Sequence, residues 1–157
     1  MSNFEKNLEQ ALNNAKRLTD KILIDGKLIS AQTNNKIPVL NPSTGDNIGY
    51  APQCDKNDVN IAVESAYKAF QKWKKIPARE RGKMVAAGAK RLEERKSEIE
   101  TLLSLDTGNA LRTQAIPETA ASIELTNMFA GLSGELKGEN YPTNIPNSIH
   151  YTTRDPI

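Results

Sequence analysis

An apolar stripe within residues 56–73 constrains the fold of this chain more than any other feature. Its members recur at intervals of four, three, four and three: Val59, Val63, Ala66, Phe70 and Trp73. This spacing predicts an amphipathic helix, and Asp55 with Asp58 forms a helix-start pattern just before it. Because a one-sided helix must bury its apolar face against another element, the fold depends on what covers this face.

Three further segments show helical spacing. Residues 3–19 carry a narrow stripe made of Phe4, Leu8, Ala11, Ala15 and Leu18. Residues 78–96 form the next predicted helix, with an inward face made of Met84, Val85, Gly88, Ala89 and Leu92. Ser97 and Glu100 predict a capping box that restarts the helix, and Gly108 supplies its left-handed stop. Three to four helices therefore follow the helix at the N-terminus.

The last predicted helix begins near Pro117, which suits a first helical turn because its missing N–H is not needed there. Its apolar stripe consists of Ala121, Leu125, Met128, Leu132 and Leu136, and Gly138 is its expected end. The sequence "ENYPTNIPN" at 139–147 reads as an extended connector. Residues 149–157 then alternate in character and predict a strand with two different faces.

Two hairpins are predicted between the first two helices. In "KILIDGKLIS" at 21–30, two aliphatic runs flank Asp25-Gly26, which favours a type I′ turn. In "IPVLNPSTGDNIGYA" at 37–51, a Pro- and Gly-containing turn separates two further strand-like arms. The chain is thus helix-rich, with β-hairpins near its start and a strand at its end.

Composition excludes several function classes. There are 21 basic and 19 acidic residues, interleaved along the chain, so nothing indicates nucleic-acid binding. A single cysteine cannot form an internal disulfide, which favours a reducing compartment. The N-terminal charges do not fit a signal peptide, and the longest apolar run is too short to span a membrane. We expect a soluble, cytoplasmic protein.

Cys54 and His150 are the natural candidates for catalysis, and neither fits an active site. A thiol nucleophile needs a nearby base or a strongly positive setting, and His150 lies in a distant predicted strand. We therefore expect Cys54 to be a bystander in the loop before a helix. One cysteine and one distant histidine also exclude a zinc site made by this chain alone. The predicted catalytic and metal residues are none.

Nucleotide-binding motifs are missing as well. No glycine-rich sequence follows a strand, and no P-loop occurs. The three glycines of "AGLSGELKG" at 130–138 lie at a predicted helix end, where backbone amides do not gather around an anion. Phe70 and Trp73 are expected to pack in the core. The predicted cofactor-binding residues are none.

The order of the motifs nevertheless resembles the N-terminal part of the aldehyde dehydrogenase superfamily. The blocks that carry the resemblance are "NPSTG", the helix start "DKNDV", "LDTG", the helix end "FAGLSGE" and "YTTRDP", in register from Ile22 to Ile157. The resemblance implies a Rossmann-like α/β fold and oxidation of aldehydes to acids with NAD or NADP. It also implies a division into a helical extension (1–20), the first part of the cofactor-binding domain (21–147) and the start of the oligomerisation strand (148–157).

The resemblance also sets limits. Family members are longer, and their catalytic Cys, general-base Glu, oxyanion Asn and nucleotide-binding turn lie beyond the part that matches. Cys54 does not match the nucleophile, and we expect no activity and no tight NAD or NADP binding by this chain alone. In some members, positions matching Val39, Leu40 and Asp106 bind a monovalent cation, but that site needs a further ligand from elsewhere. "LDTGNAL" departs from the family, which often has Lys-Pro after the Gly.

The low hydrophobic content fits the N-terminal part of a longer enzyme, because only 38% of residues are hydrophobic and 5% aromatic. The family's central parallel sheet is formed by later residues, so the helix faces at 59–73 and 121–136 must cover each other, meet a second copy or stay open. The predicted partners are accordingly a copy of this chain or the remainder of the enzyme, with an aldehyde as the substrate of the whole. A non-enzymatic helical interaction module derived from the family remains the alternative.

Overall fold

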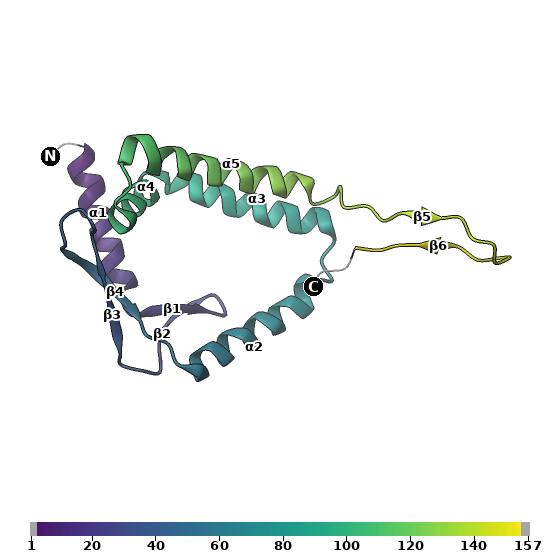
Figure 1. The fold of residues 1–157 in the computed structure, drawn as a ribbon, viewed down its shortest axis with the longest axis horizontal. Helices are drawn as coiled ribbons and strands as arrows, with labels where there is room; N and C mark the ends of the chain where they lie inside the picture. Colours follow the sequence, from purple (N-terminus) through teal and green to yellow (C-terminus); the bar gives the residue numbers. More distant parts are fainter. Residues whose placement is uncertain (1–2, 155–157) are drawn as a thin grey trace.

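The structure is a computed structural model that describes residues 3–154, and it forms an open frame rather than a filled ball (Figure 1). Five α-helices and three short strand pairs make up this part of the chain. They follow in the order α1 (Asn3–Leu18), β1 (Lys21–Ile24), β2 (Lys27–Ser30), β3 (Lys36–Leu40), β4 (Asn47–Pro52), α2 (Lys56–Trp73), α3 (Ala78–Glu94), α4 (Lys96–Thr107), the π-helical turn η1 (Leu111–Ala115), α5 (Ile116–Leu132), β5 (Asn140–Tyr141) and β6 (His150–Tyr151).

The strands form three separate antiparallel pairs, β1–β2, β3–β4 and β5–β6, and no parallel sheet occurs within residues 3–154. The first pair has the predicted turn, with φ of 51° at Asp25 and 72° at Gly26, as a type I′ turn requires. The helix-rich architecture with N-terminal hairpins and no central sheet is therefore confirmed.

The main helix pair is α3 with α5, which run side by side along one edge of the frame (Figure 1). Gly82 and Ala89 of α3 are buried, as are Ile123 and Ala130 of α5. The small residues among them, Gly82, Ala89 and Ala130, let the two helices approach closely. A second packed corner joins α1 to α4 and β4, with Ala11 of α1 fully buried.

α2 diverges from this pair and has β1 as its main tertiary neighbour (Figure 1). The predicted inward stripe of α2 is largely open to solvent, with Val59 54% and Val63 63% exposed. The stripe predicted for α5 is open too, including Leu125, Met128 and Leu132. The apolar spacing located these helices correctly, but their apolar faces do not cover each other.

Two predictions about helix ends were wrong. The Ser97–Glu100 capping box is absent: α4 begins at Lys96 after a kink at Arg95, whose φ is −111° and whose guanidinium binds the Glu98 carboxylate at 2.5 and 3.0 Å. That carboxylate raises the pKa of Arg95 through its hydrogen bonds and charge. α5 ends at Leu132 rather than near Gly138.

The predicted C-terminal strand is also shorter than expected. Only His150 and Tyr151 are in strand conformation, and they pair with Asn140 and Tyr141 of β5. The two strands form a narrow arm that projects from the α3–α5 end of the frame (Figure 1). The last part of the predicted strand, residues 155–157, lies outside the described residues.

The start of α2 is a complete capping box. The Asp55 carboxylate accepts hydrogen bonds from the N–H groups of Asn57 at 2.8 Å and Asp58 at 3.0 Å. The buried Asp58 carboxylate accepts in return from the N–H groups of Asp55 at 3.1 Å and Gln32 at 3.0 Å. Asp58 thus ties the helix start to the loop that follows β2.

We expect Asp55→Ala to lower the free energy of unfolding of α2 by about 1 kcal/mol, because two amides at the helix start lose their acceptor. Trp73, the only tryptophan, lies at the other end of α2 and reports its unfolding by fluorescence in a urea titration. Asn60→Ala on the exposed side of α2 is the control and should leave the midpoint nearly unchanged. Equal midpoints for Asp55→Ala and the control would show that the cap contributes nothing.

Candidate functional site

Two of the distinctive sequence blocks meet in space, and the first is the turn between β3 and β4. The Asn41 carbonyl accepts hydrogen bonds from the N–H groups of Gly45 at 2.8 Å and Thr44 at 3.3 Å. The Asn41 side chain accepts from the Ser43 N–H at 2.9 Å, which makes an Asx turn. Asn41 therefore explains why "NPSTG" folds as a tight, self-supporting loop.

The second block, "LDTG", ends α4 against this turn. Gly108 adopts the left-handed conformation with φ of 76°, and its N–H donates to the Ser104 carbonyl at 3.0 Å. A Cβ at Gly108 would lie 2.8 Å from Cγ of Pro42, so the two blocks are in direct contact. The sequence showed both blocks, but not that they touch.

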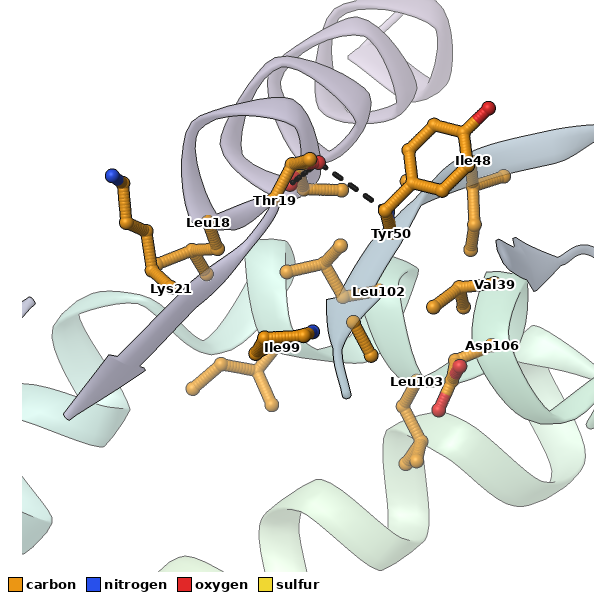
Figure 2. Close-up of a pocket in the computed structure, with 14 residues that line it drawn as sticks. Leu18, Thr19, Lys21, Val39, Ile48, Tyr50, Ile99, Leu102, Leu103 and Asp106 are labelled. Atoms are coloured by element: carbon orange, nitrogen blue, oxygen red, sulfur yellow. Dashed lines mark hydrogen bonds between the residues drawn. The ribbon is translucent and has the colours of Figure 1, made fainter. Parts of the chain in front are cut away.

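A pocket of ≈ 490 Å³ lies beside this contact, between the end of α1, the β3–β4 hairpin and α4 (Figure 2). Its walls are mainly apolar: Ala15, Leu18, Val39, Ile48, Ala51, Pro52, Ile99, Leu102 and Leu103, with Thr19, Lys21, Gly49, Tyr50 and Asp106 completing the lining. The register of β3 and β4 shifts between Val39 and Leu40, which leaves Ile48 as the extra residue of a bulge. Ile48 is buried there.

The end of α1 closes one side of the pocket. The Thr19 hydroxyl donates to the Ala15 carbonyl at 3.3 Å and accepts from the Tyr50 N–H at 3.4 Å (Figure 2). The Asp20 N–H donates to the Tyr50 carbonyl at 3.0 Å. The segment 1–20 is thus attached to β4 through its last turn, a contact that sequence spacing alone did not indicate.

The structure brings Val39 and Asp106, two positions considered for a cation, to the same pocket. Asp106 is exposed, and its carboxylate makes no hydrogen bond or ion pair with any described residue. Asp106 is the one carboxylate of this lining, whereas hard cations such as Ca²⁺ or Mg²⁺ usually take six or more oxygen ligands. The residues present therefore form part of a cation site at most.

The two catalytic candidates lie on separate parts of the frame. Cys54 is exposed in the loop before α2, and His150 is exposed on the projecting arm (Figure 1). Within residues 3–154, no three His, Cys, Asp or Glu side chains gather in a way that could hold a metal ion. No described helix is both long and apolar enough to cross a bilayer.

The residues present do not fit a dinucleotide. In the part of the chain that the structure describes, α2 and α3 begin after Asp55 and Pro77, and neither start carries the glycine-rich turn that approaches a pyrophosphate. Gly131 and Gly134 lie at the end of α5, where the helix dipole repels anions. None of the helix starts within residues 3–154 thus carries the glycine-rich turn that holds a pyrophosphate.

Comparison with known proteins gives a consistent result. The model of the aldehyde dehydrogenase family matches residues 28–157. The aldehyde dehydrogenase tropH of Talaromyces stipitatus is 37% identical over 87% of this chain and 27% of its own length. The mitochondrial benzaldehyde dehydrogenase of Antirrhinum majus is 31% identical over 88% of this chain and 26% of its own length.

Solved structures agree with the sequence matches. Betaine aldehyde dehydrogenase from Staphylococcus aureus, crystallised with NAD⁺, superposes with a TM-score of 0.83 and 27% identity over 91% of this chain and 29% of that chain. The chain thus spans about a quarter of the length of the curated relatives it matches. With the family model covering residues 28–157, the chain belongs to the aldehyde dehydrogenase family.

Proposed function

We propose that this chain forms the N-terminal part of an NAD(P)-dependent aldehyde dehydrogenase, which oxidises aldehydes to carboxylic acids, and that it is inactive alone. The family match over residues 28–157 carries the proposal. The NAD⁺ bound in the Staphylococcus aureus relative supports the choice of cofactor. The exposed Cys54 and the missing dinucleotide site support inactivity of the isolated chain.

We propose three parts within the chain: a helical extension (1–20), the first part of the cofactor-binding domain (21–147) and the start of the oligomerisation strand (148–157). The bonds from Thr19 and Asp20 to β4 support an extension that is attached to the rest. The partners would be a copy of this chain or the remaining part of the enzyme. The free Cys54 is consistent with a cytoplasmic setting.

An assay with NAD⁺ or NADP⁺ and benzaldehyde or betaine aldehyde tests the proposal. We expect no reduced cofactor above the blank from the purified chain, and no heat of NAD⁺ binding at concentrations up to about 1 mM, where even weak binding would register. Adding a separately produced chain with the remaining family residues should restore turnover. Turnover by the isolated chain would refute inactivity, and no turnover with the complementing chain would refute the enzymatic role.

The alternative is a non-enzymatic interaction module. One observation favours it: apolar side chains of α2 and α5 face solvent along most of both helices. Such faces are typical of surfaces that bind other proteins. A module of this kind would bind its partner without restoring turnover, so the complementation assay separates the two functions.

A further inference from the structure

The projecting arm meets the helical frame at Gly138, the glycine that was expected to end the last helix (Figure 1). Because α5 already ends at Leu132, Gly138 does not serve as a helix stop. It lies at the base of the arm, beside Glu139, and faces Thr152 on the returning strand. Its contacts at this position indicate a different role.

Three residues, Gly138, Glu139 and Thr152, join the two strands at the base and are here called the arm clasp. Glu139 lies opposite Thr152, one step beyond the pair of Asn140 and Tyr151. The Thr152 N–H donates to the Glu139 carbonyl at 2.9 Å, and the Glu139 N–H donates to the Thr152 hydroxyl at 2.9 Å. In a regular antiparallel pair, the second bond would go to the Thr152 carbonyl.

The Thr152 carbonyl instead lies against Gly138. A Cβ at Gly138 would overlap the carbonyl oxygen and would lie 2.9 Å from the carbonyl carbon. Both atoms belong to the backbone, so no side-chain rotation could relieve this overlap. The arm clasp therefore closes only around a glycine.

Beyond the arm clasp, hydrogen bonds hold the arm along its length. The Tyr141 hydroxyl donates to the Glu139 carboxylate on the same strand, and β5 pairs with β6. At the tip, the Ser148 hydroxyl donates to the Ile145 carbonyl at 2.7 Å. Bending within the arm would break these bonds, so the direction of the arm depends on its base.

The link between α5 and the arm is also anchored on the side of the frame. A Cβ at Gly134 would lie 3.2 Å from Cγ of Arg79, because the Arg79 side chain of α3 covers this glycine. The Glu135 N–H donates to the Leu132 carbonyl at 2.9 Å, which extends the end of α5 by a turn. Residues 136–138 are thus left as the joint between frame and arm.

We propose that the arm clasp sets the direction in which the arm leaves the frame, with Gly138 as the positioning residue. Any Cβ at this position would push the Thr152 carbonyl away and let the arm swing about its base. The use of a fixed direction rests on the proposed oligomerisation strand (148–157), because a preorganised element binds a partner at a lower entropic cost. The test reads the arm itself and is therefore independent of the enzyme assay and of any assembly.

The distance between two spin labels tests the direction of the arm. In a Cys54→Ser background of the 157-residue chain, Ala87→Cys on α3 and Asn144→Cys at the arm tip provide two exposed labelling sites. Dilution with unlabelled chain restricts the measurement to distances within one molecule. We expect one narrow distance distribution, and Gly138→Ala should roughly double its width, because overpacking is relieved by a backbone shift.

Gly131→Ala is the matched control for the spin-label measurement. Nothing lies within 4 Å of a Cβ built at Gly131, so the distribution should stay narrow. Far-UV circular dichroism checks that the helices of both variants remain folded. A broad distribution before any glycine is replaced, or equal widths for Gly138→Ala and Gly131→Ala, would overturn the proposal.

Amide hydrogen exchange measured by NMR tests the hydroxyl of the arm clasp. Thr152→Val keeps the shape of the side chain but removes the acceptor of the Glu139 N–H, whereas Thr152→Ser keeps a hydroxyl at the same place. Thr152→Val should speed exchange of the Glu139 amide about fivefold or more, and Thr152→Ser should leave it nearly unchanged. Unchanged exchange in Thr152→Val, or the same increase in both variants, would overturn the proposal whatever the enzyme assay shows.

Discussion

Gly82→Val is expected to lower the free energy of unfolding by about 3 kcal/mol, one of the largest effects of any single substitution in this chain. Gly82 is buried where α3 crosses α5, and a Cβ there would lie 2.5 Å from the Ala130 carbonyl oxygen and even closer to the Ser133 hydroxyl. The Ser133 side chain can rotate away, but the Ala130 carbonyl belongs to the backbone of α5. The helices must therefore separate.

Gly88→Val on the same helix is the matched control. Nothing lies within 4 Å of a Cβ built at Gly88, so only helix propensity changes there, and valine is slightly better than glycine. Far-UV circular dichroism on heating should show a midpoint lower by roughly 6–12 °C for Gly82→Val and little changed for Gly88→Val, at one protein concentration. Similar midpoints would mean that the α3–α5 contact contributes little to stability.

Local signals in the sequence predicted most of the elements. Asp25-Gly26 specified its hairpin, Asp55 and Asp58 specified the start of α2, and Gly108 specified the end of α4, each through backbone chemistry within a few residues. This turn, this helix start and this helix end are made by neighbouring residues and need no distant partner. They therefore form even though few other elements pack against them.

Burial could not be predicted in the same way. Val63 and Leu125 have the spacing of core residues, but both are exposed, because spacing shows which face is apolar and not whether anything covers it. Conversely, Gly82 and Thr119 are buried without an apolar side chain, because close helix crossing selects small residues. The helix break falls at Arg95, whose guanidinium pairs with Glu98, and not at Ser97, where a capping box was predicted.

The candidate site shows the same limit. Val39 and Asp106 entered the sequence interpretation only through family resemblance, and their common pocket depends on how the β3–β4 hairpin packs on α4. The bulge that buries Ile48 and the bonds from Thr19 to β4 leave no pattern in the sequence. Contacts between segments far apart in the sequence, 31 residues for Thr19 and Tyr50, can be read only from the fold.

Gly108→Ala should lower the free energy of unfolding by about 2–5 kcal/mol, because two separate costs meet at this position. An L-residue in the left-handed region costs about 1–2 kcal/mol, and Gly108 has φ of 76°. The added Cβ would also lie 2.8 Å from Cγ of Pro42, and relieving such overpacking costs about 1–3 kcal/mol. Thermal unfolding followed by circular dichroism measures the sum.

Gly45→Ala separates the two costs. Gly45 has the same φ of 76°, but nothing lies within 4 Å of its Cβ position, so only the backbone cost of about 1–2 kcal/mol applies. The excess penalty of Gly108→Ala over Gly45→Ala then measures the contact with Pro42. In a Pro42→Ala background the crowding atom Cγ is gone, and the excess should largely disappear, as a double-mutant cycle would show. If the extra loss of stability persists in the Pro42→Ala background, it must arise within the end of α4 itself. The contact between Pro42 and Gly108 would then contribute little to stability.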